Sequence, residues 1–491
     1  MKIFKKTNNP IIINSIVYIT SNLLLKAFNF LLLPLYTRYL STDDYGITSL
    51  VTKFQNVACY IISCCLHTSA IRMYADYKND NEKVKRLFGT IVTFVFLCAI
   101  SFLVLCVVFN KVLIRLVFSG VVFWPTIFMS MIALIFITLF MIFQEIMKGM
   151  QKAKHVAFAS FLYFFVQFGL NILMVVILKK GANGVIFSSI ISNFLASMVI
   201  LVYLIKKKLI KFCIDRKMLK ECLMYSLPLL PHNVSASASS LISNVFINDF
   251  GSLSSVGIFS LASQFGSVAE TVESSSNTAF QPWYYRQMNE NKGDAVPSIR
   301  KTSDLLVWFY GFVLIGICFF SKEVILFLCD RAYSDAWTVV PLIAVVYIIN
   351  IPYFFYVNIL FYNKKGTKYI FLATLPASCL NICLSFFFIQ WWGMYGSVIS
   401  DIIFVVVKFL IIFLLSRKFD KDTYSIFSFL GKMFLIVVIC LIGIVPSFLF
   451  YRENVAFNEF MFKIMLLIFY SLLALSYYQK SKHINTPGNN A

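Results

Sequence analysis

Long apolar stretches alternate with short, basic polar segments along the whole chain. An α-helix needs about 20 mainly apolar residues to cross the hydrocarbon core of a bilayer. Stretches of that kind predict about fourteen spans: 11–36, 46–71, 87–109, 121–147, 155–178, 184–205, 221–248, 255–280, 302–321, 337–362, 367–390, 394–416, 428–450 and 459–478. The seventh and eighth are the most polar, because both are rich in Ser and Asn. The pattern predicts an all-α integral membrane protein with about 14 transmembrane helices.

The composition supports a membrane protein and argues against a nucleic-acid-binding one. Hydrophobic residues make up 59% of the 491 positions and charged residues 13%, whereas soluble domains carry about 25% charged residues. The net charge of +21 is spread over short tracts between apolar stretches. No soluble region is large enough to present the basic face that nucleic-acid binding requires. The twelve Cys lie mostly inside apolar stretches without CxxC spacing, so we interpret them as small buried hydrophobic residues.

The distribution of Lys and Arg orients the chain in the membrane. With the N-terminus inside, 31 basic residues fall on the cytoplasmic side, and 9 fall on the opposite side, Lys322 and Lys463 among them. Cytoplasmic segments carry an excess of Lys and Arg. The bias predicts a multi-pass protein of the cytoplasmic membrane with both termini cytoplasmic.

Short sequence matches recur at a displacement of about 211 residues. Gly46–Leu50 recurs as Gly257–Leu261, Ser15 and Asn22 recur as Ser226 and Asn233, Asn171 and Ile172 recur as Asn381 and Ile382, and Gly181–Gly184 recurs as Gly393–Gly396. The displacement equals six spans, so the two halves keep the same direction and form parallel repeats. Such repeats enclose a central cavity.

The repeat divides the chain into four parts. We expect an N-terminal six-helix bundle at 1–205, a cytoplasmic linker at 206–220 and a C-terminal six-helix bundle at 221–416. Two additional helices and the C-terminal tail occupy 417–491. The predicted fold is therefore two parallel-related bundles plus two C-terminal helices.

Polar residues recur at helical spacing on one face of the first, second, seventh and eighth spans. Those faces hold Ser15, Asn22, Lys26 and Asn29; Ser49, Lys53, Asn56, Tyr60, Ser63 and His67; Ser226, Asn233, Ser237, Ser240 and Asn244; and Ser260, Ser263, Ser267, Glu270, Ser274, Asn277 and Gln281. Ser and Asn also join helices to each other in membranes. A Lys inside the membrane is costly, so Lys26 and Lys53 favour a hydrated cavity.

The cavity charges have two interpretations. Lys26 and Lys53, with Arg38 near the outer mouth, suit an anionic ligand such as a phosphate. Alternatively, the two Lys pair with Glu270 or Glu273 in a bridge between the bundles. Both interpretations stay open. The candidate cavity residues are Asn22, Lys26, Asn29, Arg38, Lys53, Asn56, His232, Asn233, Glu270, Glu273 and Asn277.

A further charged pair lies in the twelfth span. Lys408 and Asp401 lie seven residues apart on one helical face, because residues with that separation project from the same side of a helix. We expect them to pair with each other or with neighbouring residues.

Motifs of soluble enzymes are absent from the sequence. There is no P-loop, no GxGxxG after a strand and no HExxH, and the four His have no metal-ligand spacing. We expect no enzyme, no catalytic residue, no metal and no cofactor. The chain contains no ATPase module, so ATP cannot drive transport within it, and coupling to an H⁺ or Na⁺ gradient stays open.

Several segments resemble a known family. Pro34–Leu40 followed by Asp44-Tyr45-Gly46 is similar to the end of the first span in bacterial oligosaccharide flippases. These are the polysaccharide transporters of the multidrug/oligosaccharidyl-lipid/polysaccharide superfamily. Similar segments are Ser226–Pro228 with Pro231-His232-Asn233, Gly257–Leu261, Pro282–Arg286 and Asn171–Gly184. The outer loop departs from the family in reading Thr42-Asp43-Asp44 before Tyr45-Gly46 where Pro–Glu is common.

The resemblance implies two six-helix bundles that open alternately to either side of the membrane. The implied substrate is an oligosaccharide on a polyprenyl diphosphate, carried to the outer leaflet for surface polysaccharide such as O-antigen or capsule. The two additional helices would hold its lipid tail. A polysaccharide polymerase, glycosyltransferases and membrane lipid are the expected partners.

Two alternatives stay open. One is a multidrug or peptidoglycan lipid-precursor exporter of the same superfamily. The other is a membrane glycosyltransferase or polymerase, which would need a carboxylate cluster in a large outer loop. The longest outer loop, about residues 322–336, is short for that purpose.

Overall fold

The computed structural model of the chain describes residues 30, 32–290, 292–363, 366, 369–451 and 456–483. Within these ranges every regular element is a helix and no strand occurs. The chain forms two compact units, Met1–Gly257 and Ile258–Ala491. Helix α12 (Leu253–Glu290) begins in the first unit and continues in the second. The repeat boundaries expected at 205, 220 and 416 stay a prediction.

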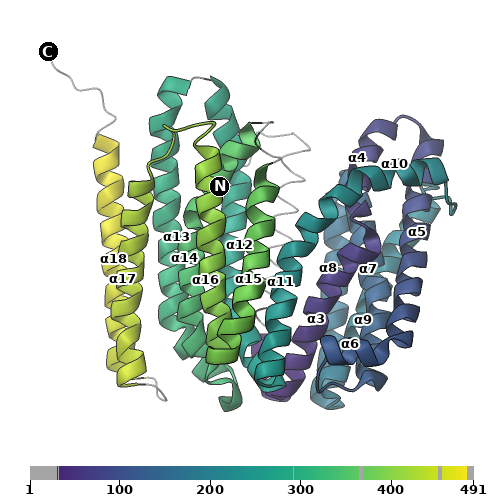
Figure 1. Ribbon diagram of the computed structural model, residues 1–491, viewed down its shortest axis with the longest axis horizontal. Coiled ribbons are helices and arrows are strands. Elements are labelled where there is room, and N and C mark those ends of the chain that lie inside the picture. Colours follow the sequence, from purple (N-terminus) through teal and green to yellow (C-terminus); the bar gives the residue numbers. More distant parts are fainter. Residues whose placement is uncertain are drawn as a thin grey trace. The chain divides into compact units, whose positions relative to one another are not determined.

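The first unit contains the helices drawn in purple to teal in Figure 1. They are α2 (Leu33–Tyr39), α3 (Thr42–Ser63), α4 (Leu66–Tyr77), α5 (Asn81–Val108), α6 (Asn110–Leu116), η2 (Phe123–Ile127), α7 (Phe128–Gly149), α8 (Ala153–Asn171), η3 (Ile172–Ile177), α9 (Gly181–Lys206), α10 (Arg216–Ser226), η4 (Leu227–Leu229) and α11 (Leu230–Phe250). Helix α7 packs against α3, α4, α5 and α9, so it forms the centre of this unit.

The second unit contains the helices drawn in teal to yellow. Besides most of α12 they are α13 (Lys292–Leu328), η5 (Arg331–Tyr333), α14 (Ala336–Tyr362), α15 (Ile370–Trp392), α16 (Met394–Ser416), α17 (Ile426–Leu449) and α18 (Phe457–His483). Helix α14 packs against α13, α16 and α17, and α15 packs against α16. Helices α17 and α18 pack against each other and against α13, as Figure 1 also shows.

The predicted all-α membrane fold is confirmed. A helix occurs at every predicted span from the second to the fourteenth, and the first span lies almost entirely outside the described residues. Ten helices in the described ranges are long and apolar enough to cross a membrane, or eleven if α3 and α4 form one bent span. Helices α11 and α12, at the predicted seventh and eighth spans, are too polar to meet that measure. The total of fourteen stays a prediction.

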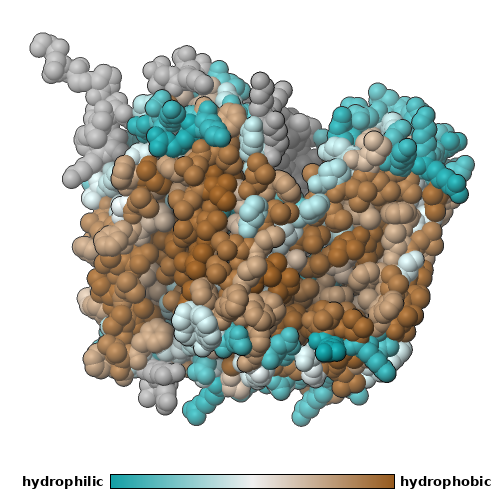
Figure 2. All heavy atoms as spheres, viewed as in Figure 1, coloured by the Kyte–Doolittle hydropathy of each residue, from teal (hydrophilic) through white to brown (hydrophobic). Residues whose placement is uncertain are grey.

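The surface of the helices fits a bilayer. In Figure 2, hydrophobic side chains cover the middle of the visible helices of each unit, and hydrophilic side chains gather at the helix ends. Many large hydrophobic side chains are exposed on the membrane-spanning helices, such as Val104, Leu105 and Val108 on α5 and Phe434 and Leu441 on α17. Lipid tails can cover these side chains, whereas water would leave them unfavourably solvated.

The predicted second span is not one straight helix. The backbone of Cys64 and Cys65 adopts the left-handed conformation, with φ of 46° and 56°. The two helices on either side, α3 and α4, therefore meet at an angle of 43°. Neither residue is a Gly or Pro, so no turn signal in the sequence marked this break.

A close backbone approach joins the beginnings of α3 and α12. A Cβ atom on Gly46 would lie 2.1 Å from the carbonyl oxygen of Leu253, and one on Gly257 would lie 2.1 Å from that of Thr42. Thr42 and Leu253 are separated by the same 211 positions as Gly46 and Gly257. The contact is reciprocal, as expected for two helix starts related by an internal two-fold repeat. Glycine is required at both positions because any side chain would collide with a carbonyl.

Candidate functional site

Helix α3 in the first unit has one face packed against α7 and another that carries predicted cavity residues. Gln55 donates a hydrogen bond to the carbonyl oxygen of Ser130 at 2.9 Å, which fixes the packed face. On the other face Lys53 is half-buried and Asn56 is exposed. A polar side chain that lies exposed on a membrane helix, as Asn56 does, is costly against lipid. Its placement therefore favours contact with water or with a polar ligand.

The predicted stripe on α11 is partly used in packing. Asn244 donates a hydrogen bond to Ser49 of α3 at 3.2 Å, and Asn233 donates one to the Sγ atom of Cys65 at 3.4 Å. His232 is exposed near the start of the helix. Polar groups of this stripe therefore join α11 to the α3–α4 segment, which is the packing role that Ser and Asn have in membrane helices.

The remaining predicted site residues of the first unit are Arg38, Asn22, Lys26 and Asn29. Arg38 is exposed in the last turn of α2. Asn22, Lys26 and Asn29 lie outside the described residues. The roles of these residues in binding stay predictions.

Helix α12 carries two carboxylates inside the second unit. The side chain of Glu273 is 1% exposed, and neither of its oxygen atoms has a hydrogen-bond partner among the described residues. Asn350 of α14 lies beside it. Glu270, one turn earlier, is exposed. Buried carboxylates are normally hydrogen-bonded or paired, so Glu273 is an exception that calls for a functional explanation.

A cation that interacts with these carboxylates comes from α16. Lys408 interacts electrostatically with Glu273, Glu270 and Asp401, and its Nζ atom lies 4.2 Å from the centre of the Tyr353 ring. Asp401 in turn accepts a hydrogen bond from Asn381 of α15 at 2.9 Å. We call Glu270, Glu273, Asp401 and Lys408 the α12–α16 charge cluster. Lys408 thus interacts electrostatically with Asp401 and neighbouring carboxylates, and its expected pairing with one of them stays a prediction.

The composition of the α12–α16 charge cluster determines what it can bind. Three carboxylates face one ammonium group, so the cluster is net negative when all four groups are ionised. Protonation of a carboxylate or a bound monovalent cation would reduce this negative charge by one unit. Asn277, one turn beyond Glu273, is engaged elsewhere, since its Oδ1 atom accepts a hydrogen bond from Asn358 at 2.7 Å.

A second buried set of charges joins α13, α17 and α18. Lys322 contacts Glu459 at 2.8 Å, and Lys463 contacts Glu459 at 2.7 Å and Glu323 at 2.6 Å. Ser447 of α17 donates a hydrogen bond to Glu459. We call Lys322, Glu323, Glu459 and Lys463 the Lys463 network. Its two Lys are completely buried, and its charges cancel, so it serves as a structural connection.

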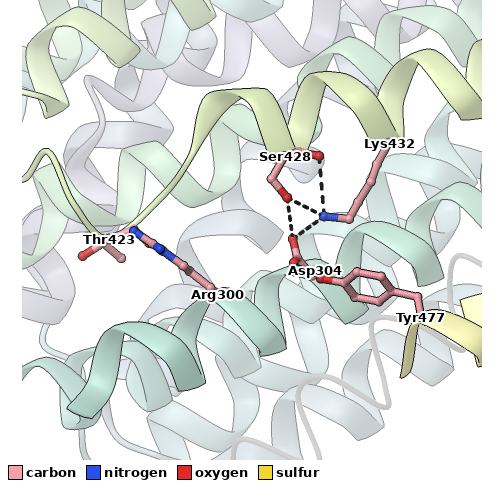
Figure 3. Close-up of polar contacts among 6 residues, drawn as sticks. All are labelled: Arg300, Asp304, Thr423, Ser428, Lys432 and Tyr477. Carbon is pink, nitrogen blue, oxygen red and sulfur yellow. Dashed lines mark hydrogen bonds and ion pairs between the residues drawn. The ribbon is translucent and has the colours of Figure 1, made fainter. Parts of the chain in front are cut away.

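A third set of polar groups joins the same three helices near their other ends (Figure 3). Asp304 of α13 contacts Lys432 of α17 at 2.6 Å and accepts a hydrogen bond from Tyr477 of α18. Ser428 accepts a hydrogen bond from Lys432, also at 2.6 Å. One turn before Asp304, Arg300 donates to the carbonyl oxygen of Thr423 at 3.0 Å, which holds the segment before α17. We call Asp304, Ser428, Lys432 and Tyr477 the Asp304 cluster.

Neither the Lys463 network nor the Asp304 cluster was anticipated from the sequence. Lys322, Lys432 and Lys463 were counted as charges at the membrane surface, yet the structure buries Lys322 and Lys463 completely. The spacing of Glu459 and Lys463, four residues apart on α18, was the only local signal of a pair. No set of three or more His, Cys, Asp or Glu residues in the described ranges is arranged to hold a metal ion.

Comparison with known proteins adds a family and a fold. A family model described as polysaccharide biosynthesis protein matches residues 11–288. A protein of the Lsg locus of Haemophilus influenzae is 22% identical over 433 residues, which is 81% of this chain and 96% of that protein. The family match over residues 11–288 covers more than half of the chain.

Two solved structures have a similar fold. One is the lipid II flippase MurJ in an inward closed conformation, with a TM-score of 0.69, 18% identity, and coverage of 96% of this chain and 99% of that one. The other is an inward-facing multidrug resistance transporter of the MATE family, with a TM-score of 0.64, 14% identity, and coverage of 78% and 92%. At these identities the similarity establishes the fold alone.

Proposed function

Because this chain belongs to the polysaccharide biosynthesis protein family, we propose that it is a flippase for polyprenyl-diphosphate-linked oligosaccharides. It would carry them across the cytoplasmic membrane by alternating access, for the synthesis of a surface polysaccharide such as O-antigen or capsule. The observation that supports this function most is the family match over residues 11–288 in a chain built of membrane-spanning helices. Both termini would lie in the cytoplasm, where glycosyltransferases would supply the substrate, and a polysaccharide polymerase would use it outside.

The physical task explains why such a protein carries polar groups inside the membrane. A sugar diphosphate cannot cross about 30 Å of hydrocarbon without losing its water, and losing that water is very costly for a charged group. Polar side chains on the spanning helices replace part of this water. The polyprenyl tail needs no such replacement, because it can remain in lipid.

Lys53 and Asn56 are the described residues best placed to meet the head group. Both belong to the face of α3 that is not packed against α7, and Asn56 is exposed. A Lys in a low-dielectric setting attracts a diphosphate more strongly than it does in water. We assign Lys53 to the diphosphate and Asn56 to the sugar or diphosphate oxygens, with Lys26, Asn22 and Asn29 as further ligands from the first span.

The α12–α16 charge cluster would couple transport to an ion gradient. Glu273 has no hydrogen-bond partner among the described residues, and the cluster carries an excess of negative charge. Uptake of H⁺ or Na⁺ at Glu273 would reduce that charge. If one conformation binds the ion better than the other, ion binding shifts the equilibrium between them.

A transport assay with purified protein tests the function. The protein is reconstituted in lipid vesicles with a polyprenyl-diphosphate-linked oligosaccharide that bears a fluorescent sugar, and a reagent that cannot cross the membrane quenches the outer pool. Flipping increases the fraction that is quenched with time. We expect wild-type protein to flip this lipid and Lys53→Gln to lower the rate about tenfold or more. Lys206→Gln, an exposed Lys at the end of α9, should match wild type.

The same vesicles distinguish the alternatives. Transport of a peptidoglycan lipid precursor or of a cationic dye, with no flipping of the oligosaccharide lipid, would contradict the proposal and favour the corresponding exporter. Loss of flipping in Lys206→Gln as well as in Lys53→Gln would show that net charge, and not the position of Lys53, governs the rate.

A further inference from the structure

Helix α10 is too short to span a membrane. Its eleven residues, Arg216–Ser226, extend over about 16 Å at 1.5 Å per residue, roughly half the thickness of the hydrocarbon core. It is amphipathic and follows the most basic tract of the chain. Between 206 and 220 lie seven basic residues, Lys206, Lys207, Lys208, Lys211, Arg216, Lys217 and Lys220.

The segment that contains α10 is held firmly against the rest of its unit. The backbone N–H of Lys211 donates to the carbonyl oxygen of Lys85 at 3.1 Å, and that of Asp215 donates to the Oγ1 atom of Thr90 at 3.1 Å. Helix α10 packs against α4 and α5, and its Cys222 is fully buried. The opposite face of α10 therefore has a fixed position.

That opposite face forms a groove of about 470 Å³. It is lined by Arg216, Leu219, Lys220, Leu223, Met224, Leu227 and Pro228. The two basic residues belong to the beginning of α10, and the apolar residues continue to its end, where the chain enters α11. Met224 is 68% exposed and Leu227 is 43% exposed, so nothing in the described chain covers the apolar part.

The charges of the groove are available to a ligand. Arg216 and Lys220 are exposed and one helical turn apart, and neither forms an ion pair with a carboxylate in the described part of the chain. The two acids nearby are used locally. Asp215 accepts hydrogen bonds from the backbone N–H groups of Lys217 and Met218, and Glu221 accepts one from Tyr77 at 3.2 Å.

We propose that this groove binds an anionic phospholipid of the adjacent leaflet, with the phosphate between Arg216 and Lys220 and an acyl chain along Leu223, Met224 and Leu227. The order of the residues supports this occupant. A membrane lipid carries its charge at the interface and its chains deeper, and the groove places Arg216 and Lys220 before Leu223, Met224 and Leu227 as the chain approaches α11. Basic amphipathic helices bind anionic leaflets in this way. The inference is independent of the transported substrate.

Native mass spectrometry of the full-length protein tests the proposal. Detergent-solubilised protein is titrated with phosphatidylglycerol or with phosphatidylcholine of the same acyl chains. The variant Arg216→Gln/Lys220→Gln removes the groove cations, and Lys206→Gln/Lys207→Gln removes the same charge from exposed positions outside the groove. We expect wild type to bind phosphatidylglycerol in preference to phosphatidylcholine. The groove variant should lose this affinity about tenfold, and the control should stay within twofold of wild type.

Three results would overturn the proposal. The first is equal binding of both lipids by wild type, and the second is an equal loss in the two variants, which would indicate attraction by net charge alone. The third is displacement of phosphatidylglycerol by an equimolar polyprenyl diphosphate, which would identify the groove as a site for that lipid. All substituted residues are exposed, and an unchanged circular dichroism spectrum would verify that the variants fold.

Discussion

Two sets of charged residues lie within the second unit, and they differ in how well their charges are compensated. In the Lys463 network each Lys contacts a carboxylate at 2.6 to 2.8 Å, and the charges cancel. In the α12–α16 charge cluster, Glu273 has no hydrogen-bond partner among the described residues, and Lys408 rests over the Tyr353 ring. The residue types are the same. Compensation therefore distinguishes a charge that holds helices together from one that is available for transport.

The difference has a physical basis. A buried ion pair offsets the cost of dehydration only when its geometry is good and its remaining hydrogen bonds are made. The Lys463 network comes closer to this condition, because each Lys contacts a carboxylate and only the Oε2 atom of Glu323 is buried without a hydrogen-bond partner among its described atoms, and the network connects α18 to α13. The α12–α16 charge cluster does not meet it, and a protein keeps such a costly arrangement where function requires it.

Removing one member of the compensated network should have the largest effect on stability. Lys463→Met removes the ion-pair partner of Glu323 and leaves Glu459 with Lys322 as its single cationic partner in the network. Breaking a buried pair in this way costs about 3–5 kcal/mol. Thermal unfolding in detergent, followed with a dye that reacts with newly exposed thiols such as Cys318 and Cys440, measures the loss. Arg72→Ala, which removes an exposed pair with Asp76, should cost less than about 1 kcal/mol.

The Asp304 cluster should give an intermediate result, because its ion pair is less completely buried. The side chains of Lys432 and Asp304 are 11% and 14% exposed. Asp304→Asn keeps the shape of the side chain but weakens its hydrogen bonds with Lys432 and Tyr477. A hydrogen bond to a charged group contributes about 1.5–3 kcal/mol to the free energy of unfolding. Asp422→Asn, an exposed acid of the neighbouring loop, is the matched control and should unfold at the wild-type temperature. If Asp304→Asn lowered the free energy of unfolding as much as Lys463→Met does, the degree of burial would not determine the size of the loss.

A neutral contact of the first unit sets a reference for these charged ones. Gly46→Ala places a methyl group against the carbonyl oxygen of Leu253, so the start of α3 must shift. Overpacking of this kind costs about 1–3 kcal/mol. Gly169→Ala in α8 is the control, since an added Cβ there meets nothing within 4 Å, and it should be neutral or slightly stabilising. Similar melting temperatures for the two variants would show that the reciprocal contact is not tight.

The helices and some of the charged residues could be predicted from the sequence, whereas the contacts between distant helices could not. The helices follow from apolar length, and Glu270 follows from a polar stripe on one face, because both signals are local. The Lys463 network could not be predicted, since Lys322 and Glu459 are 137 positions apart and Glu323 and Lys463 are 140 apart. The break at Cys64 and Cys65 lacks a Gly or Pro to announce it. Lys322 and Lys463 were expected at the surface because a charge near a helix end is usually solvated.

The smallest effect on stability, and the sharpest test of the comparison, should come from Glu273→Gln. Glutamine has the shape of glutamate and can keep its place beside Asn350. It also removes a buried charge that has no hydrogen-bond partner in the described ranges. The free energy of unfolding should therefore change by no more than the roughly 1 kcal/mol that is typical of point substitutions. Flipping in vesicles, however, should lose its dependence on an imposed H⁺ or Na⁺ gradient, because Gln can neither release a proton nor supply a negative charge.

Glu270→Gln, on the exposed face of the same helix, is the control and should keep at least part of that dependence. A loss of stability close to that of Lys463→Met would identify Glu273 as a structural partner of Lys408, and compensation would then not separate the two sets of charges. Wild-type stability together with wild-type gradient dependence would instead remove Glu273 from the coupling mechanism.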